Sequence, residues 1–389
     1  MRFSGFDDEW KKSNLGNISS NEMYGMNSAA KDYDGFNKYI RITDISETSN
    51  KFIPNPLTSP DGDLEDKYKL KKGDIVFART GASTGKTYLY DDNDRNLYFA
   101  GFLIKFHIDN ADPKFIFYNT LKEEYLNWVS VMSVRSGQPG INSNEYKKLP
   151  IILPSLDEQN KISNFLTSID KKIDLLERKH QFYQEFKKFL MQQIFTQKLR
   201  FNFTDEWEKY LLGDISLIGK GFTPSTSNPS FWDGDLKWLS IADMNQGKYI
   251  NQTTKKITSD GSKNKEPVKK GTLLMSFKLS IGKLGILTED MYTNEAICNF
   301  KWKNKDVLTE YMYYYLSSIN ILKYGSQAAK GITLNNETLS TIPVLLPSLE
   351  EQKKIINILS DVDMKINMLE NSINDTSKFK KGLLQQMFV

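Results

Sequence analysis

Two stretches of the chain carry apolar residues at alternating spacings of four and three positions, the pattern of a helix that packs along another helix. Neither stretch contains proline, and at about 1.5 Å per residue each would form a rod about 60 Å long. We predict that the two helices pair with each other as an antiparallel coiled coil. The predicted seam consists of Ile162, Leu166, Ile169, Ile173 and Leu176 in the first stretch and Ile355, Leu359, Val362, Ile366 and Leu369 in the second.

These two stretches are parts of a longer internal repeat. The first begins with LPSLDEQ at residues 153–159 and the second with LPSLEEQ at residues 346–352. Fainter matches precede them, such as LKKGDIVFARTGASTGK at 70–86 and VKKGTLLMSFKLSIGK at 268–283. The period is about half the chain, far longer than that of a solenoid repeat. The duplication predicts two equivalent modules related by a pseudo-twofold axis. Their different interiors predict one task performed on two different targets.

The remaining parts of each module combine short strands with one helix. Apolar runs such as GDIVFAR are bounded by Gly, Asp, Asn and Pro, which is typical of strands and turns. Residues 113–129 and 309–324 read as helices. We therefore predict an α+β protein with two pseudo-twofold-related domains separated by the long two-helix coiled coil. The predicted boundaries are a first domain at 1–153, a central helix at 154–200, a second domain at 201–345 and a distal helix at 346–389.

Composition limits the function classes. The single cysteine, Cys298, excludes a disulfide framework and is typical of a reducing cytoplasm, where we expect the protein to act. No run of about 18 apolar residues occurs, so we expect no membrane span. The net charge is only +4. Any nucleic-acid site must therefore be a local patch, since the whole molecule has no strong field.

Two apparent catalytic motifs lack residues that their chemistry requires. GASTGKT at 81–87 resembles a phosphate-binding loop, but it is one residue short and TYLYDD after it does not read as a helix. NPSF at 228–231 resembles a motif of amino-methyltransferases, but its second proline and a preceding glycine-rich turn are missing. The chain has only two histidines, His107 and His180. We therefore predict no catalytic constellation and no metal site.

The order of these motifs resembles a known family. The two-copy plan, LPSLDEQ and LPSLEEQ, GDIVFARTGASTGK and GFTPSTSNPSFW together are similar to the specificity (S) subunit of type I DNA restriction-modification systems, over nearly the whole chain. The resemblance implies that the variable domains are target-recognition domains, each reading one half of an asymmetric, interrupted DNA sequence. It also implies that the paired helices act as a spacer and dock two modification (methyltransferase) subunits.

The same resemblance assigns the chemistry to partners. The modification subunits would carry S-adenosylmethionine and methylate adenine, and the restriction subunits, joined through the assembled complex, would carry ATP and magnesium. This chain would bind double-stranded DNA, hold no cofactor of its own and catalyse no reaction.

Polar loop residues are the candidate DNA contacts, since Arg, Lys, Ser, Thr, Gln and Asn suit phosphates and base edges. Arg79 is the preferred reader of a guanine because its planar fork matches O6 and N7, and the lysines suit phosphates. The second copy has Phe277-Lys278-Leu279 where the first has Arg79-Thr80-Gly81, which predicts a different half-site. In the first domain the candidates are Arg79, Thr80, Ser83, Thr84, Lys86, Gln138 and Asn142. In the second they are Lys220, Thr223, Ser225, Lys278, Ser280, Lys283, Lys330 and Asn335.

Two other functions stay open at this point. The chain could be a duplicated coiled-coil scaffold that binds proteins and has no DNA specificity, with the polar loops simply solvated. It could also be a stand-alone methyltransferase-nuclease fusion, although the missing cofactor motif opposes this. A DNA reader should lose affinity steeply as salt rises, through counterion release, and a scaffold should not.

Overall fold

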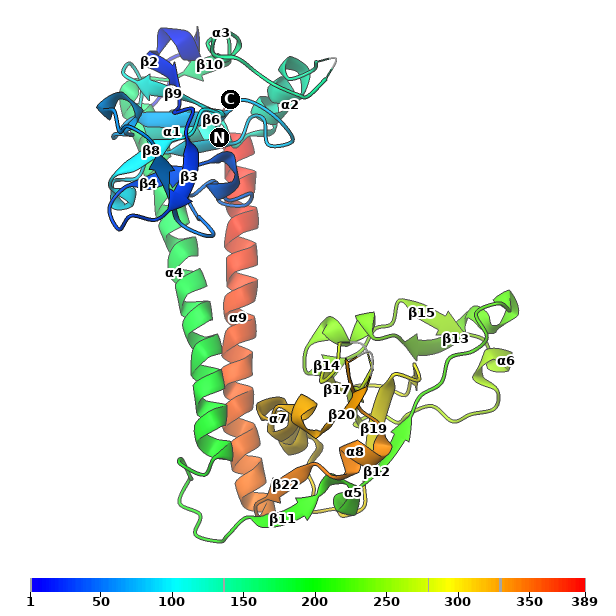
Figure 1. Ribbon diagram of the computed structural model, residues 1–389. Helices are drawn as coiled ribbons and strands as arrows, with labels where there is room; N and C mark the ends of the chain where they lie inside the picture. Colours follow the sequence, from blue (N-terminus) through cyan, green and yellow to red (C-terminus); the bar gives the residue numbers. More distant parts are fainter. Residues whose placement is uncertain (1, 136, 279, 329–330, 389) are drawn as a thin grey trace. The chain divides into compact units, whose positions relative to one another are not determined.

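The structure is a computed structural model that describes residues 2–135, 137–278, 280–328 and 331–388. The chain divides into two compact units (Figure 1). The first unit contains Met1–Leu176 and Asn371–Val389, and the second contains Glu177–Glu370. The boundaries predicted from the sequence lie at the ends of the long helices, whereas this division lies inside them. Each unit therefore contains one variable domain and a part of both helices.

In the first unit, a mixed domain precedes the first long helix. Its main antiparallel sheet has the strand order β2-β9-β6-β7, and smaller pairs join β1 to β10, β3 to β5 and, in parallel, β4 to β8. The strands are β1 (Lys11–Asn14), β2 (Ser19–Tyr24), β3 (Ala29–Asp32), β4 (Lys38–Ile40), β5 (Thr58–Asp61), β6 (Asp74–Ala78), β7 (Thr87–Leu89), β8 (Leu97–Phe99), β9 (Leu103–Ile108) and β10 (Pro150–Leu153). The helices are α1 (Pro113–Asn119), α2 (Glu123–Met132) and α3 (Ser143–Tyr146), with 3₁₀ turns η1 (Leu15–Asn17), η2 (Ile42–Asp44), η3 (Asp66–Tyr68) and η4 (Asp92–Asp94).

The second unit repeats this plan. Its main sheet has the order β12-β19-β16-β17-β14, so β12, β19, β16 and β17 correspond to β2, β9, β6 and β7. The strands are β11 (Glu208–Leu211), β12 (Ser216–Lys220), β13 (Trp232–Leu239), β14 (Tyr249–Ile250), β15 (Lys255–Ile257), β16 (Leu273–Ser276), β17 (Leu284–Leu287), β18 (Tyr292–Thr293), β19 (Ile297–Trp302), β20 (Ser326–Ala328), β21 (Gly331–Thr333) and β22 (Pro343–Leu346). The helices are α5 (Leu212–Ile215), α6 (Ser259–Ser262), α7 (Thr309–Ser318) and α8 (Asn336–Ser340), with 3₁₀ turns η5 (Pro229–Phe231), η6 (Ala242–Gln246) and η7 (Ile321–Tyr324).

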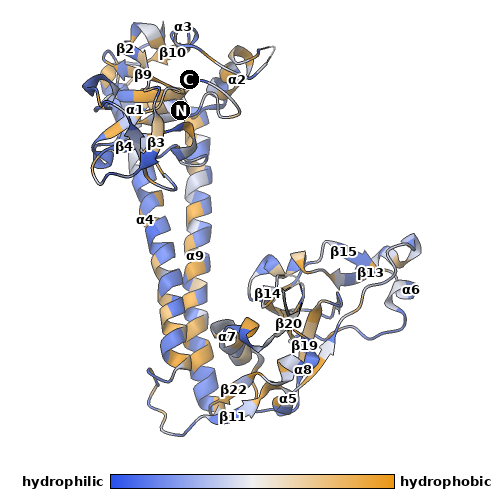
Figure 2. Cartoon of the chain, viewed as in Figure 1, coloured by the Kyte–Doolittle hydropathy of each residue, from blue (hydrophilic) through white to orange (hydrophobic). Residues whose placement is uncertain are grey.

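The two long helices are α4 (Leu156–Phe195) and α9 (Leu349–Met387), and they run antiparallel (Figure 1). In the first unit the start of α4 and the end of α9 share one hydrophobic core. In the second unit the end of α4 and the start of α9 share another. Hydrophobic and hydrophilic positions alternate along both helices (Figure 2). All the predicted seam residues are buried or half-buried.

An ion pair between a partly exposed arginine and a buried glutamate fixes the start of each long helix. Ser155 and Ser348 cap the helices, each hydroxyl accepting from the N–H three residues later. That third residue is a glutamate, and each glutamate is only 1% exposed. Arg2 donates from Nε and Nη2 to the two oxygens of Glu158 at 2.9 and 2.7 Å. The second unit repeats this fork between Arg200 and Glu351 at 3.0 and 2.7 Å.

The glutamine that follows each glutamate ties the helix to the domain before it. The Oε1 atom of Gln352 accepts from the Leu308 N–H at 3.0 Å, and its Nε2 donates to the carbonyls of Pro347 and Asp306. Gln159 repeats this pattern with the Asp112 N–H and the Pro154 carbonyl. Both glutamines are buried, so the LPSL-x-EQ repeat is a docking motif between helix and domain.

A three-residue clasp also recurs in both units. In the first, Asp170 of α4 accepts from Tyr118 Oη at 2.7 Å and pairs with Lys380 of α9 at 2.6 Å, while the Lys380 Nζ lies 5.4 Å from the Tyr118 ring centre. Burial, followed by the charge of Asp170, raises the pKa of Tyr118, so its hydroxyl stays a neutral donor. In the second unit the same clasp joins Tyr314, Asp363 and Lys187. Each clasp connects a variable domain to both helices. A polar group placed in this way can fix the register of a helix pair.

Replacing Gln352 with alanine should lower the free energy of unfolding by about 1–3 kcal/mol, because it leaves buried backbone groups without partners. Gln192→Ala is the matched control, since that side chain is exposed and makes no hydrogen bond to another described residue. Urea unfolding followed by circular dichroism would measure both. Equal stability of the two variants would contradict the docking role of Gln352.

Candidate nucleic-acid interface

The loop between β6 and β7 is a compact turn whose shape is set by backbone hydrogen bonds. The Ala78 N–H donates to the Lys86 carbonyl at 2.8 Å, and the Gly85 N–H donates to the Ala78 carbonyl at 2.9 Å. Gly85 has a φ of +91°, and a Cβ there would lie 2.6 Å from a side-chain carbon of Val129. Glycine is therefore required at this position. The loop presents residues 79–84 on a rigid base.

Residues 137–142 lie against this loop, so the structure brings together two segments that are far apart in the sequence. The Gly81 N–H donates to the Pro139 carbonyl at 3.0 Å, and the Ile141 N–H donates to the Arg79 carbonyl at 2.9 Å. A buried tyrosine supports the base of the loop, since Tyr146 Oη donates to the Ala78 carbonyl at 2.7 Å. Burial raises the pKa of Tyr146, which keeps this donor protonated.

Arg79 is the central cation of this surface. Its guanidinium carbon lies 4.8 Å from the centre of the Tyr24 ring. The backbone N–H of Arg79 donates to the Phe102 carbonyl at 3.0 Å. Phe102 is 62% exposed at the turn between β8 and β9. Tyr24 and Phe102 were missed by the sequence analysis. Each adjoins a glycine at a strand end, Gly25 and Gly101, and this signal of close backbone approach could have indicated them.

The other candidates of the first unit fall into two groups. The side chains of Thr80, Ser83 and Gln138 form no hydrogen bond to another described residue, so they are available to a ligand. Thr84, Lys86 and Asn142 are already engaged. Thr84 Oγ1 donates to the Gly81 carbonyl at 2.7 Å, and Asn142 caps α3. Lys86 pairs with Glu47 and donates to the Ile45 carbonyl at 3.1 Å, with 9% of its side chain exposed. As DNA contacts these residues stay predictions.

The second unit has the same backbone hydrogen bonds at the base of the loop, with different side chains and one residue fewer in the loop. The Gly282 N–H donates to the Ser276 carbonyl at 2.8 Å and the Ser276 N–H to the Lys283 carbonyl at 2.9 Å, which matches the bonds around Ala78. The Phe277 N–H donates to the Ala296 carbonyl at 3.0 Å, as the N–H of Arg79 does to Phe102. Phe277 thus occupies the position of Arg79, but its side chain is buried. Lys283 donates to Asn245 at 2.7 Å, an anchor that parallels the anchor of Lys86.

A surface hollow of about 350 Å³ gathers three of the second unit's candidates, Lys220, Lys278 and Asn335. Lys220 and Lys278 are exposed, and the Lys278 Nζ lies 5.7 Å from the centre of the Phe277 ring. Neither lysine forms an ion pair with another described residue. The Oδ1 atom of Asn335 caps α8 by accepting the Thr338 N–H at 2.8 Å, so only its amide nitrogen is available. The lining of the hollow thus holds two lysines and one carboxylate, that of Glu337, which leaves a positive balance of charge.

The other candidates of the second unit lie in turns. Thr223 Oγ1 accepts from Asn294 at 3.0 Å and donates to Glu295. The Ser225 hydroxyl contacts that of Ser227 at 2.8 Å. The carbonyl of Ser280 accepts from the Ser276 hydroxyl. Lys330 lies outside the described residues.

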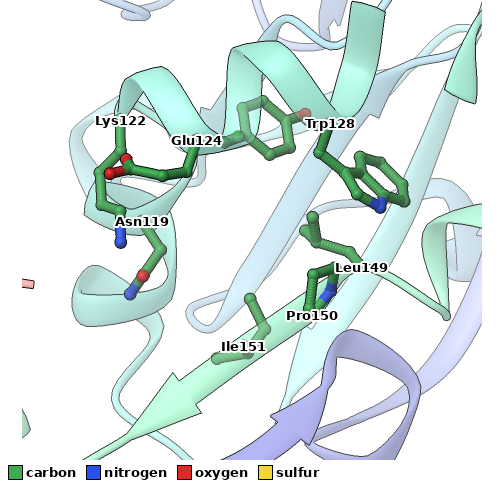
Figure 3. A pocket seen from close by; sticks show the side chains of 8 residues that line it. Asn119, Lys122, Glu124, Trp128, Leu149, Pro150 and Ile151 are labelled. Carbon is green, nitrogen blue, oxygen red and sulfur yellow. The ribbon is translucent and has the colours of Figure 1, made fainter. Parts of the chain in front are cut away.

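A pocket of about 70 Å³ lies between α2 and β10 in the first unit, with Lys122 and Glu124 on one side and Leu149, Pro150 and Ile151 across from them (Figure 3). Burial lowers the pKa of Lys122. A pocket of this size holds a few water molecules, since sites for small molecules are about 300–1,000 Å³. We therefore do not consider it a cofactor site.

The described residues hold neither a metal-binding cluster nor a membrane-spanning helix. Within them, no group of three or more His, Cys, Asp or Glu side chains is placed to hold a metal ion. No helix in the same part of the chain is long and apolar enough to cross a membrane.

Comparison with known proteins distinguishes a DNA specificity subunit from a scaffold without DNA specificity. The model of the type I restriction modification DNA specificity domain matches residues 7–181 and matches again at residues 204–376. The chain belongs to this family. It is a specificity subunit of a type I restriction-modification system, with two target-recognition domains, and the scaffold without DNA specificity is not favoured.

Individual relatives agree with this assignment. The specificity subunit is 24% identical to the type I restriction enzyme HindI specificity subunit of Haemophilus influenzae, over 94% of this chain and 95% of that protein. Its fold matches the HsdS subunit from Thermoanaerobacter tengcongensis with a TM-score of 0.52 and 18% identity, covering 98% of this chain and 97% of that chain. It also matches the type I restriction-modification S subunit from M. genitalium with a TM-score of 0.61 and 14% identity, covering 100% and 97%.

Proposed function

We propose that this specificity subunit reads an asymmetric two-part site in double-stranded DNA, with the first unit reading one half and the second unit the other. The observation that carries this proposal is the exchange of Arg79 for Phe277 at equivalent positions of one backbone frame. The shared frame holds each surface in the same way, while Arg79 presents hydrogen-bond donors and the buried side chain of Phe277 presents none. Two half-sites of different sequence follow from this difference.

Charge supports DNA as the ligand of both surfaces. Arg79, Lys220 and Lys278 form no ion pair with another described residue, although many lysines and arginines of this chain do. A cation without a carboxylate partner can neutralise a phosphate or reach a base edge without first breaking an ion pair. These residues therefore form local basic patches on a chain of small net charge.

Arg79→Ala tests whether each unit reads its own half-site. In cells that also carry the modification subunits, mapping of methylated adenines should show that the variant relaxes one position of a single half-site, at a cost of about 1–3 kcal/mol. Lys278→Ala should leave that half-site unchanged, because it alters the other unit. If Arg79→Ala weakened methylation equally at all sequences, Arg79 would be a phosphate contact.

The chemistry of the complex, in this proposal, belongs to its partners. S-adenosylmethionine would be held by modification subunits, and ATP with magnesium by restriction subunits, while this chain supplies DNA specificity in the cytoplasm. The absence of a recognisable cofactor motif in the sequence supports this division.

The purified chain alone should neither methylate nor cut DNA. Incubation of a duplex with the chain, S-adenosylmethionine, ATP and magnesium should leave the DNA unmodified, and addition of the modification subunits should restore methyl transfer. Methyl transfer by the chain alone would overturn the proposed division of chemistry.

An exposed row of phenylalanines on α4 is the candidate docking face for a modification subunit. Phe182, Phe186 and Phe189 follow a spacing of four and three, which places them on one face of the helix beside the seam. Phe182 and Phe186 stack with their ring centres 6.2 Å apart, and all three side chains are exposed. Exposed aromatic rows of this kind mark interaction surfaces. Their heptad-like spacing suits a partner that also presents a helix.

Replacement of all three phenylalanines with serine should abolish or strongly reduce co-purification with the modification subunit, because the apolar contact is lost. DNA binding by the chain itself should persist. Phe36→Ser is the control, since Phe36 is even more exposed, at 68%, but lies in a loop of the first unit. Undiminished co-purification of the triple variant would show that the modification subunit docks elsewhere.

A further inference from the structure

The guanidinium of Arg79 is held differently from other guanidinium groups of the chain. Arg2, Arg41, Arg135 and Arg200 each bond to a carboxylate. The guanidinium carbon of Arg79 instead lies 4.8 Å from the centre of the Tyr24 ring, and its N–H groups donate to no other described residue. An aromatic face attracts a cation and leaves the edge of the planar group, with its hydrogen-bond donors, unoccupied.

The Tyr24 ring is itself fixed in place. Its hydroxyl accepts from the Ser143 N–H at 3.2 Å and contacts the Ser143 hydroxyl at 3.4 Å, at the first residue of α3. Behind the ring, Gly25 passes so close to the neighbouring strand that a Cβ on it would lie 2.3 Å from the Ala100 carbonyl oxygen. The backbone at Tyr24 therefore has little freedom, and the ring offers a fixed platform.

The second unit lacks this platform at the equivalent position. Gly221 makes the same close approach as Gly25, so the residue before it, Lys220, corresponds to Tyr24. Phe277 corresponds to Arg79 and is buried. The cation and the aromatic side chain have thus exchanged places between the two units. The second surface offers ammonium groups, from Lys220 and Lys278, where the first offers a planar fork.

We propose that Tyr24 is a positioning residue for specificity: it holds the Arg79 fork in the orientation that reads a guanine of the first half-site. The second unit reads its half-site without such a fork. This inference rests on the proposed function, because it assumes that the loop of Arg79 faces DNA. Beyond that function, Tyr24 sets the orientation of the Arg79 fork, and only the first unit has this pair of side chains.

The test measures how strongly the complete complex of this chain with its modification subunits prefers its own site over sites with one base pair changed. After the methylated site has been mapped, dissociation constants are measured for a duplex that carries the site and for duplexes with one base pair changed at a time. Arg79→Ala should reduce discrimination at a guanine position of one half-site by about 5- to 150-fold. Tyr24→Leu should reduce it at the same position by about 2- to 5-fold. Tyr24→Phe, which keeps the ring, should retain most of the discrimination.

Matched controls separate positioning from general damage. Tyr33→Leu removes a tyrosine of the same unit with nearly the same exposure, 39% against 38% for Tyr24, and should change nothing. Thermal unfolding of each variant checks that the fold is intact. If Tyr24→Leu weakened binding to every duplex equally, or relaxed a different position from Arg79→Ala, the positioning role would be wrong and the proposed function would stand. If the unaltered complex bound all duplexes alike, the proposed function would fail, and this inference with it.

Discussion

Neither recognition unit can close its hydrophobic core without the far end of the opposite helix. Leu383, Met387 and Phe388 at the end of the chain pack into the first core, where the Phe388 ring lies 4.9 Å from Phe115. Leu190, Ile194 and Phe195 at the end of α4 pack into the second core in the same way. Burial of both helix ends therefore enforces the antiparallel pairing. The duplication allows this exchange within one chain, because each module supplies the helix end that packs into the core of the other.

Polar groups then fix the register of the two long helices, which apolar packing alone leaves adjustable. A hydrophobic seam allows neighbouring registers at modest cost, whereas a buried carboxylate allows only the one in which its partner is present. Glu158 and Glu351 meet an arginine from their own unit, and the clasps on Asp170 and Asp363 join a domain to both helices. These contacts recur at matching positions in the two units. The internal repeat is therefore visible in individual atoms as well as in the order of the strands.

The reading surfaces of the two units likewise share backbone hydrogen bonds and differ in their side chains. Their shape depends on backbone hydrogen bonds, such as those at Ala78 and Ser276, and on glycines with a positive φ at Gly85 and Gly282. These bonds join backbone atoms, although in the second unit the Ser276 hydroxyl also accepts from the Lys283 N–H at 3.0 Å. Arg79 and Phe277 occupy the same place in this frame, although the second loop is one residue shorter. A domain of this design can change its target while it keeps its fold.

The sequence by itself determined the long helices, their seam and the duplication, because these depend on local periodicity and on direct comparison of the two halves. It also indicated the loop at 79–86 and the segment at 137–142 as polar surfaces. Only the tertiary structure paired these segments, placed the Tyr24 ring against Arg79 and buried Phe277, because contacts between distant residues leave no periodic signal. Likewise, the sequence could select Lys86, Asn142 and Asn335 by residue type alone. The fold decided that Lys86 anchors a loop and that both asparagines cap helices, since a polar side chain binds whichever partner the folded backbone brings to it.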